Sequence, residues 1–491
     1  MQNTNRFFAT RRRFLRDASL SLLTLAITGC SESRLERKKP NIIFIMTDDQ
    51  GPWAWGISGN KDAYTPNLDS LAKQGAYVKN CFSTCPVCSP ARASLMTSRY
   101  ASECGIPDYI SRDQPDLGLD SEFVTWPEVF SDHGYATALV GKWHLGARDR
   151  YHPSRFGYQE FTGFRAGGRV SKDPEIEIDG EIKKVSGYTP DILTDHALDF
   201  IKRKQEKPFL LSLHFWAPHA NNGNYTADGD RTWLPVRDEI WNRFKEMQPK
   251  LPQTDINGLD VERTKRMMRE YLASIAAVDR NIKRVVDTLN NLGLTGNTVI
   301  IFTADQGFNM GHNGIWHKGN GKWLLKSNPN KPRPNLYDNS MRTPTLVYWP
   351  KTIKPGTIVE QNITNLDWYP TLLSMAGLPV PENTIIRGNN FFPLLRGRDI
   401  EWENDVFGQY DMWEWHQTGA DLRTYRTNRY KLIRDFEHPD KDEFYDLIND
   451  PEERNNLIDS KNSEVRQAIE ALQKQMNGKM KEIDDPRCET F

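Results

Sequence analysis

Four short apolar runs, each followed by polar residues, dominate the hydrophobic pattern of the chain. They span residues 41–46, 136–140, 208–215 and 297–302. Near-continuous apolar runs of this length are typical of strands buried on both faces of a mostly parallel sheet. Helical patterns lie between them, and residues 271–292 carry an apolar stripe at helical spacing. The pattern predicts an α/β fold with a large, mostly parallel or mixed sheet sandwiched by helices.

Ionisable and amide side chains follow all four predicted strands. In chain order they are Asp48 and Asp49, Lys142 and His144, His219, and Asp305 and Gln306. In open α/β sheets, ligands bind beyond the carboxyl ends of the strands. One such end would be a weak signal, because aspartate also favours turns. Four ends together predict a single site.

The pattern changes near residue 399. Strand-like runs at 406–410, 430–433 and 443–447 precede a polar helical segment near 463–481. Strands followed by a helix are typical of α+β architecture. We therefore expect a catalytic domain over residues 41–398 and a smaller C-terminal α+β subdomain over residues 399–491.

The N-terminal segment has the features of a bacterial export signal in the usual order. Three arginines at 11–13 precede a mostly apolar stretch over 18–27, which indicates twin-arginine export. The following Thr-Gly-Cys, ending at Cys30, resembles a lipobox, in which the cysteine is lipidated; the alternative is an ordinary amphipathic helix. We expect residues 1–29 to be the signal and residues 30–40 a tether, with the protein anchored in a bacterial cell envelope through the lipid on Cys30.

Composition excludes several classes of protein. Among 491 residues, 64 Lys and Arg balance 65 Asp and Glu, so the electrostatic footprint of a nucleic-acid-binding protein is absent. No run of 18 apolar residues exists, so the sequence predicts no membrane-spanning helix. The six cysteines, at positions 30, 81, 85, 88, 104 and 488, fit no zinc pattern and predict no particular disulfide.

The residues around Cys88 indicate that this cysteine has a catalytic role. Pro90 suits the first turn of a helix, which places Cys88 at or just before a helix N-terminus. The helix dipole and the free N–H groups favour anions there. With Arg92 one turn further on, Cys88 is a candidate nucleophile. The alternative is a buried structural cysteine.

These residues resemble the formylglycine-dependent type I sulfatases of the alkaline phosphatase superfamily. Cys88, Pro90 and Arg92 match the signature Cys-x-Pro-x-Arg, and the segment 134–144, ending in Gly-Lys-Trp-His, matches the second signature. The resemblance continues through Asp-Gln-Gly at 305–307, Leu-Tyr-Asp-Asn-Ser-Met-Arg-Thr-Pro at 336–344 and the tail at 444–452. It implies an alkaline phosphatase-like fold. It also implies that a maturase oxidises Cys88 to formylglycine, whose hydrate attacks the sulfur of a sulfate ester.

The resemblance also implies a metal site. One divalent cation, usually calcium, would be held by Asp48, Asp49, residue 88, Asp305 and Gln306. Hard cations prefer such oxygen donors, and calcium tolerates an irregular shell better than magnesium. Gln306 departs from the family, which commonly has Asn or His there.

Roles for the remaining site residues follow from the same resemblance. Arg92 and Lys142 would hold the hydrate at position 88, His144 would act as base, and His219 would protonate the leaving oxygen. Lys142, His219 and Lys318 would bind the sulfate, although Lys322 or Lys326 could replace Lys318.

The expected activity is hydrolysis of sulfate esters, with carbohydrate sulfates as the expected substrates. Alternatives are a hydrolase of phosphodiesters or phosphonate monoesters on the same scaffold, and an inactive, lipid-anchored glycan-binding protein. Residues 318–335 contain four lysines and Arg333 but no acid. This segment predicts either a basic rim that contacts an anionic glycan or a solvated surface loop.

Overall fold

The computed structural model describes residues 39–167, 170–222, 225–227, 229–327, 331–415 and 418–488. The predicted export signal and Cys30 lie outside these ranges and stay predictions. Within the described ranges, no helix is both long enough and apolar enough to cross a membrane.

The four predicted strands form the centre of a ten-stranded sheet. They are β1 (Asn41–Thr47), β3 (Ala136–Lys142), β7 (Phe209–His214) and β8 (Thr298–Ala304). They lie side by side in the order β8-β1-β7-β3, and every adjacent pair is parallel. Their carboxyl ends therefore meet at one edge of the sheet, as the sequence pattern predicted.

Six further strands extend this sheet and make it mixed. The full order is β13-β2-β12-β8-β1-β7-β3-β4-β5-β6. The added strands are β2 (Ala76–Phe82), β4 (Glu160–Phe164), β5 (Glu175–Ile178), β6 (Glu181–Lys184), β12 (Arg342–Tyr348) and β13 (Thr357–Thr364). The strand β12 runs antiparallel to both neighbours, and β5 and β6 are antiparallel at the far edge.

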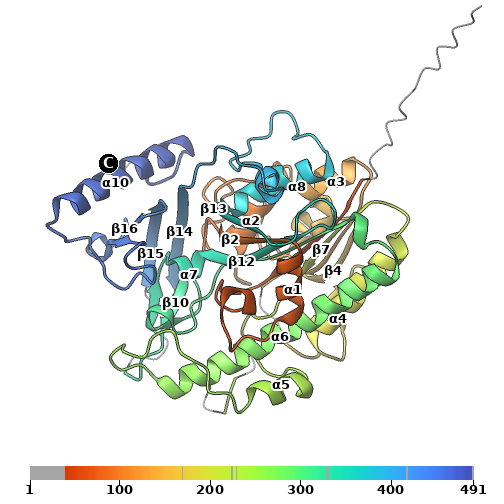
Figure 1. The fold of residues 1–491 in the computed structure, drawn as a ribbon, viewed down its shortest axis with the longest axis horizontal. Helices are drawn as coiled ribbons and strands as arrows, with labels where there is room; N and C mark the ends of the chain where they lie inside the picture. The colour runs from red at the N-terminus through yellow and green to blue at the C-terminus, as the bar shows by residue number, and fades with distance from the viewer. Residues whose placement is uncertain are drawn as a thin grey trace, which may run out of the picture. The chain divides into compact units, whose positions relative to one another are not determined.

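Helices cover both faces of the large sheet (Figure 1). One face packs on α1 (Pro66–Gln74), α4 (Thr189–Lys204) and α6 (Val261–Asn291), and the other on α2 (Cys88–Thr97), α3 (Trp126–Asp132) and α8 (Trp368–Ala376). Alternate residues of β1 face opposite layers: Phe44 contacts the rings of Trp126 and Trp368, whereas Ile45 belongs to the core with Val278 of α6. This sandwich is the predicted fold class.

A buried aspartate of α6 holds the N-terminus of α1. The Asp279 carboxylate accepts hydrogen bonds from the backbone N–H groups of Asn67, at 3.1 Å, and Leu68, at 2.8 Å. Burial nevertheless raises the pKa of Asp279 from its ordinary 3.8 to about 6. Between these values the folded chain keeps a proton that the unfolded chain releases. The free energy of unfolding therefore falls as the pH rises through this range, by up to about 3 kcal/mol from this group.

Replacing Asp279 by asparagine should remove this contribution, because asparagine does not titrate. In chemical denaturation between about pH 4 and pH 6, the slope of the unfolding free energy against pH should be less negative for Asp279→Asn than for the original chain. Asp287→Asn is the matched control, since Asp287 lies half-exposed on the same helix, paired with Lys283. Parallel curves for Asp279→Asn and the original chain would contradict the expectation.

The C-terminal part forms a smaller sheet, as predicted. Its four antiparallel strands are β14 (Val406–Trp415), β15 (Thr418–Arg426), β16 (Tyr430–Asp435) and β17 (Glu443–Asp446), in that order. One face packs on α10 (Ser463–Glu482) through residues such as Leu432 and Met476. The other face shares a core with Phe82, Cys85 and Val87. The small sheet thus supports the segment that leads into Cys88.

Short elements connect these parts. They are α5 (Asp238–Phe244), α7 (Asp338–Met341), α9 (Phe392–Leu395), and a three-stranded sheet of β9 (Ile315–Trp316), β10 (Asn320–Trp323) and β11 (Pro332–Pro334). The segment 318–335, for which the sequence predicted a basic rim or a surface loop, contains β10 and β11, and residues 332–334 pair with β10. Proline lacks a backbone N–H donor yet is tolerated in an edge strand, which is where β11 lies.

Buried ion pairs connect the motif segment 336–344 with the small C-terminal sheet. The Asp338 carboxylate accepts from Arg426 Nε at 3.0 Å and from Lys431 Nζ at 2.8 Å. Lys431 also donates to Glu453 at 2.7 Å. Burial acts to raise the pKa of Asp338, but Arg426 and Lys431 hold it far below its ordinary value. Asp338 therefore ties its motif segment to the small sheet rather than contributing to the site.

Candidate active site

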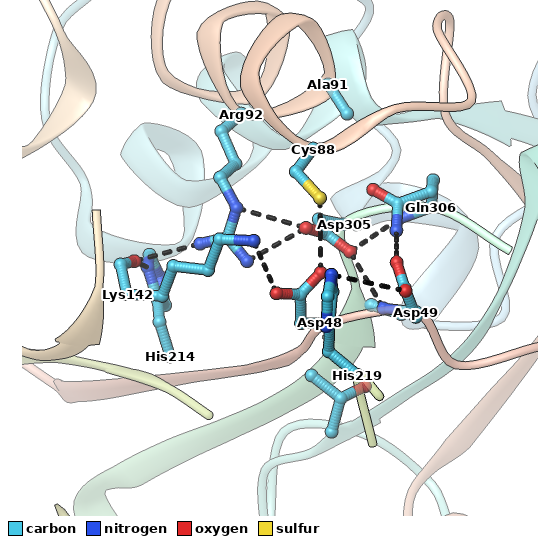
Figure 2. A network of polar contacts seen from close by, with 12 residues as sticks. Asp48, Asp49, Cys88, Ala91, Arg92, Lys142, His214, His219, Asp305 and Gln306 are labelled. Carbon is cyan, nitrogen blue, oxygen red and sulfur yellow. Dashed lines mark hydrogen bonds and ion pairs between the residues drawn. The ribbon is translucent and has the colours of Figure 1, made fainter. Parts of the chain in front are cut away.

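The carboxyl ends of the central strands and the N-terminus of α2 bring a polar cluster together (Figure 2). Its members are Asp48 and Asp49 after β1, Lys142 at the end of β3, Asp305 and Gln306 after β8, and Cys88 and Arg92 in α2. All are at most 3% exposed. Residues that the sequence predicted at three of the four strand ends thus lie together with Cys88 and Arg92 in one buried cluster.

Each carboxylate of the cluster is paired with a cation. Lys142 Nζ lies 2.5 Å from Asp48, and Lys318 Nζ binds Asp49. Arg92 donates to one oxygen of Asp305 from Nε, at 3.0 Å, and from Nη2, at 2.8 Å. Buried charges need such partners because burial removes the stabilisation that water would provide.

The three carboxyl groups differ in acidity. Burial raises the pKa of Asp49 and of Asp305 to about 6, although Lys318 opposes the rise at Asp49 and Arg92 opposes it at Asp305. Burial also acts on Asp48, but Lys142 and the other neighbouring positive charges hold its pKa well below its ordinary value. All three carboxyl groups are therefore mostly ionised at neutral pH, and additional positive charge would lower the pKa values of Asp49 and Asp305 further.

The oxygen atoms at the centre fit a divalent cation. Asp49 Oδ2 and Gln306 Oε1 are buried, and neither has a hydrogen-bond partner among the described residues. The Gln306 amide donates from Nε2 to Asp49 at 2.5 Å, which leaves its oxygen available. Potential ligand atoms of Asp48, Cys88 and Asp305 lie within 4.8 Å of one another. Three carboxylates and an amide oxygen are donors that hard cations prefer, so Gln306 is compatible with the predicted set.

Cys88 is the first residue of α2, as predicted, and it lies against the acidic cluster. Its Sγ is 3.3 Å from Asp48 Oδ1 and accepts a hydrogen bond from Lys318 Nζ at 2.7 Å. Burial, with a further contribution from Asp48, raises the pKa of the thiol to about 12. The thiolate is the nucleophilic form of cysteine, so an unmodified Cys88 would be a poor nucleophile at neutral pH.

The two predicted catalytic histidines present different ring nitrogens. His144 Nε2 lies 3.0 Å from the Ile110 carbonyl, and its Nδ1 is buried without a partner among the described residues. His219 instead places Nδ1 2.7 Å from the Ala220 carbonyl. A carbonyl only accepts, so these contacts fix the proton on Nε2 of His144 and on Nδ1 of His219. Burial lowers the pKa of His144 well below its ordinary value and that of His219 to about 3.

A cavity of about 340 Å³ opens beside this cluster. Its lining includes Cys88, Lys142, His144, His219 and Lys318. A larger hollow of about 830 Å³ along β3, β4 and α4 contains none of the predicted site residues. The smaller cavity is therefore the place where a substrate would meet the predicted chemistry.

The structure separates the three lysines that were alternatives for the sulfate-binding position. Lys318 is 2% exposed and reaches Cys88 and Asp49. Lys322 lines the cavity further out, and Lys326 is exposed and outside the lining. Arg333 pairs with Glu443. Of the predicted basic rim, only Lys318 and Lys322 line the cavity.

Sequence reasoning missed several residues at the site. His214 lies inside the predicted strand 208–215, and with Arg92 it binds the Lys142 carbonyl, at 3.2 Å and 2.9 Å. These contacts fix the end of β3. Arg112, Arg231 and His317 also line the cavity. Arg112 and Arg231 follow none of the four predicted strands, and His317 follows β9, a two-residue strand that the sequence pattern did not predict.

Comparisons with known proteins agree with this geometry. The family model described as Sulfatase matches residues 40–378, and a model described as N-sulphoglucosamine sulphohydrolase, C-terminal, matches residues 333–483. The chain is 28% identical to N-acetylglucosamine-6-O-sulfatase from Bacteroides thetaiotaomicron, with 93% of this chain and 90% of that protein covered. It is also 28% identical to an ulvan-active sulfatase from Formosa agariphila, with 92% and 83% covered.

A solved structure shares the fold. It contains a protein in complex with its substrate D-glucosamine-2-N,6-O-disulfate. The TM-score is 0.76 and the identity 25%, with 91% of this chain and 99% of that one covered. Because the family model spans more than half of the sequence and includes both signature segments, the chain belongs to the sulfatase family, whose members hydrolyse sulfate esters.

Proposed function

We propose that the chain removes sulfate from carbohydrates in the cavity beside Cys88, after Cys88 has been converted to formylglycine. The observation that carries the proposal is the position of Cys88 at the cavity wall, against three buried carboxylates and Lys318. The raised pKa of the thiol supports it, since a reactive oxygen nucleophile would replace a sulfur group that stays protonated. The carbohydrate sulfatases among the relatives support the substrate class.

Asp48, Asp49, residue 88, Asp305 and Gln306 would hold one divalent cation, which we propose to be calcium. Such an ion would neutralise the acidic cluster and polarise the sulfate oxygens. The formylglycine hydrate would supply an oxygen nucleophile and a second hydroxyl on the same carbon.

Each remaining residue of the site either positions other groups, binds the sulfate or transfers a proton. The Arg92 guanidinium donates hydrogen bonds to Asp305 and to the Lys142 carbonyl, so Arg92 holds these two groups in place. Lys142 and Lys318 place two ammonium groups beside residue 88, where they would bind the sulfate. His144 has an unprotonated Nδ1 that can accept a proton. His219 presents Nε2 at the cavity with its other proton held on Nδ1, so Nε2 would have to take up a proton when substrate binds before passing it to the leaving oxygen.

Hydrolysis of phosphodiesters or phosphonate monoesters on this scaffold is the competing activity. Sulfate and phosphate groups are nearly isosteric, so the fold alone does not show which ester is the substrate. The rates of sulfate release and phosphate release from matched aryl esters would distinguish the two activities.

The first test is peptide mass spectrometry on protein made in its native host. The fragment that contains residue 88 should carry the aldehyde and its hydrate, which requires a maturase. The same digest should contain an N-terminal peptide that begins at a lipidated Cys30, if export and anchoring follow the sequence prediction. An unmodified thiol at position 88 in active enzyme would overturn the proposed nucleophile, and an intact residue 1–29 segment would overturn the anchor.

A further inference from the structure

His317 lines the active-site cavity in a strained backbone conformation and has no part in the proposed chemistry. It lies between Trp316, the last residue of β9, and Lys318. Its φ angle is 82°, in the left-handed region that residues other than glycine adopt rarely. Such a conformation is unfavourable and persists only where surrounding contacts enforce it, which is common at functional sites.

Buried contacts enforce this conformation. The His317 carbonyl accepts hydrogen bonds from the backbone N–H and from Nδ2 of Asn309, both at 2.9 Å. The same Nδ2 donates to the Ser340 hydroxyl at 2.6 Å. Asn309 and Ser340 are both fully buried. The backbone that carries the imidazole is therefore fixed from the interior of the protein.

The imidazole ring is fixed as well. Its Nδ1 lies 2.5 Å from the Asn320 amide oxygen, which only accepts, so the ring proton is on Nδ1. The ring packs edge-on against Trp316, with the two centroids 4.9 Å apart. Burial, and after it the charge of Lys318, lower the pKa of His317 well below its ordinary value, so the ring is neutral at neutral pH. Nε2 is then an acceptor, and no described residue lies within hydrogen-bond distance of it.

The groups that would handle the sulfate ester lie beside this ring. The His317 centroid is 6.4 Å from that of His219, the proposed proton donor to the leaving oxygen, and the two rings are nearly perpendicular. Lys318, which would bind the sulfate, follows directly in the chain. A sugar whose leaving oxygen meets His219 therefore brings its neighbouring substituents toward His317. In an unmodified sugar those substituents are hydroxyl groups, which can donate to Nε2.

We propose that His317 Nε2 accepts a hydrogen bond from a free hydroxyl group neighbouring the sulfate ester, and that His317 thereby determines specificity. The inference rests on the proposed function, because it takes the ester to bind between residue 88 and His219. Substrates in which this hydroxyl is absent, alkylated or itself sulfated are disfavoured, since they leave the acceptor at the cavity wall unpaired.

Two pairs of esters test the contact in mature enzyme from the native host. The aryl pair is 2-hydroxyphenyl sulfate, with a hydroxyl beside the ester, and phenyl sulfate, without it. The sugar pair is N-acetylglucosamine 6-O-sulfate and its 4-deoxy analogue, which lacks the hydroxyl nearest the ester. In each pair, the measured quantity is the kcat/KM of the hydroxyl compound divided by that of its partner.

His317→Asn should lower this ratio at least about fivefold, the effect of losing one hydrogen bond. Asparagine tolerates the left-handed conformation, but its side chain ends short of the Nε2 position. His317→Gln should recover part of the ratio, because its longer side chain carries an amide oxygen that can accept. A merely structural role would slow both members of a pair by the same factor. Unchanged ratios in His317→Asn therefore overturn the proposal.

His312→Asn is the matched control. His312 is a histidine of the same segment, but its Nδ1 pairs with Glu452 at 3.0 Å and it does not line the cavity. Its replacement should leave both ratios as they are in the original chain. A similar loss in His312→Asn would show that the effect of His317→Asn comes from disturbance of the segment, and would overturn the proposed contact.

The two pairs also separate this inference from the proposed function. Hydrolysis of the aryl pair without release from the sugar pair would contradict the proposed carbohydrate substrate, while the aryl ratios would still decide the role of His317. Sulfate release from the sugar pair with unchanged ratios would overturn the role of His317 alone. No release from any of the four esters would overturn both.

Discussion

Cys88→Ala is expected to lower the rate of sulfate ester hydrolysis by at least about 10⁴-fold, the scale seen when a catalytic nucleophile is removed. The side chain lies at the meeting point of Asp48 and Lys318, and alanine leaves no atom that can be oxidised or attack sulfur. Chemical denaturation should show a change in unfolding free energy of no more than about 1–2 kcal/mol, because only one small side chain is shortened. Sulfate release by purified protein from the native host measures the effect.

Cys104→Ala is the matched control for this change. Cys104 is also a buried free thiol, but its Sγ contacts Thr97 rather than the acidic cluster. It should keep activity within about threefold while losing a comparable amount of stability. Retention of more than a tenth of the activity by Cys88→Ala would show that the reaction does not depend on residue 88.

The centre of the fold was predictable because its strands are buried on both faces. Continuous apolar runs identify such strands directly, because both faces of the strand pack against the core. The ends of β8, β1, β7 and β3 then become neighbours through parallel pairing alone, which brings Asp48, Lys142 and Asp305 together. This part of the site needed no knowledge of the loops.

The sequence did not predict the strand β15, because this strand lacks a continuous apolar run. It contains Asp421 and Arg423, which give the segment a polar sequence typical of a surface loop. In the structure Arg423 is fully buried, and it donates to Asp421 at 2.9 Å and to Asp485 at 2.7 Å. A partner more than 60 residues away therefore makes the burial possible, and no local pattern contains that information.

The same limit applies to the cavity wall. Lys318 could not be separated from Lys322 and Lys326 by spacing, because the answer depends on how β9 and β10 pair. Arg231 lies in an irregular segment whose position is fixed by contacts with Asn221 and Tyr225. Residues that line the cavity away from the four central strand ends are thus less visible in the sequence than those at the strand ends.

His219→Asn should affect substrates according to their leaving groups. His219 shows Nε2 at the cavity, 3.8 Å from Asp49 Oδ2, while its Nδ1 is bound to the Ala220 carbonyl. Asparagine can preserve a polar contact but cannot transfer a proton. A sugar alkoxide is a poor leaving group, so its sulfate should be cleaved roughly 10²–10⁴-fold more slowly. The nitrophenolate of 4-nitrophenyl sulfate leaves without protonation, so its cleavage should fall less than about tenfold.

His144→Asn is the companion variant that makes the comparison decisive. His144 lines the same cavity, with Nε2 fixed by the Ile110 carbonyl and Nδ1 available as a base. If it acts on residue 88 rather than on the leaving oxygen, its loss should slow both substrates by similar factors. Steady-state kcat/KM values for the sugar sulfate and the aryl sulfate give both ratios. Equal losses on the two substrates for His219→Asn would remove it from the acid role and leave Lys318, which also lies beside residue 88, as the donor to examine.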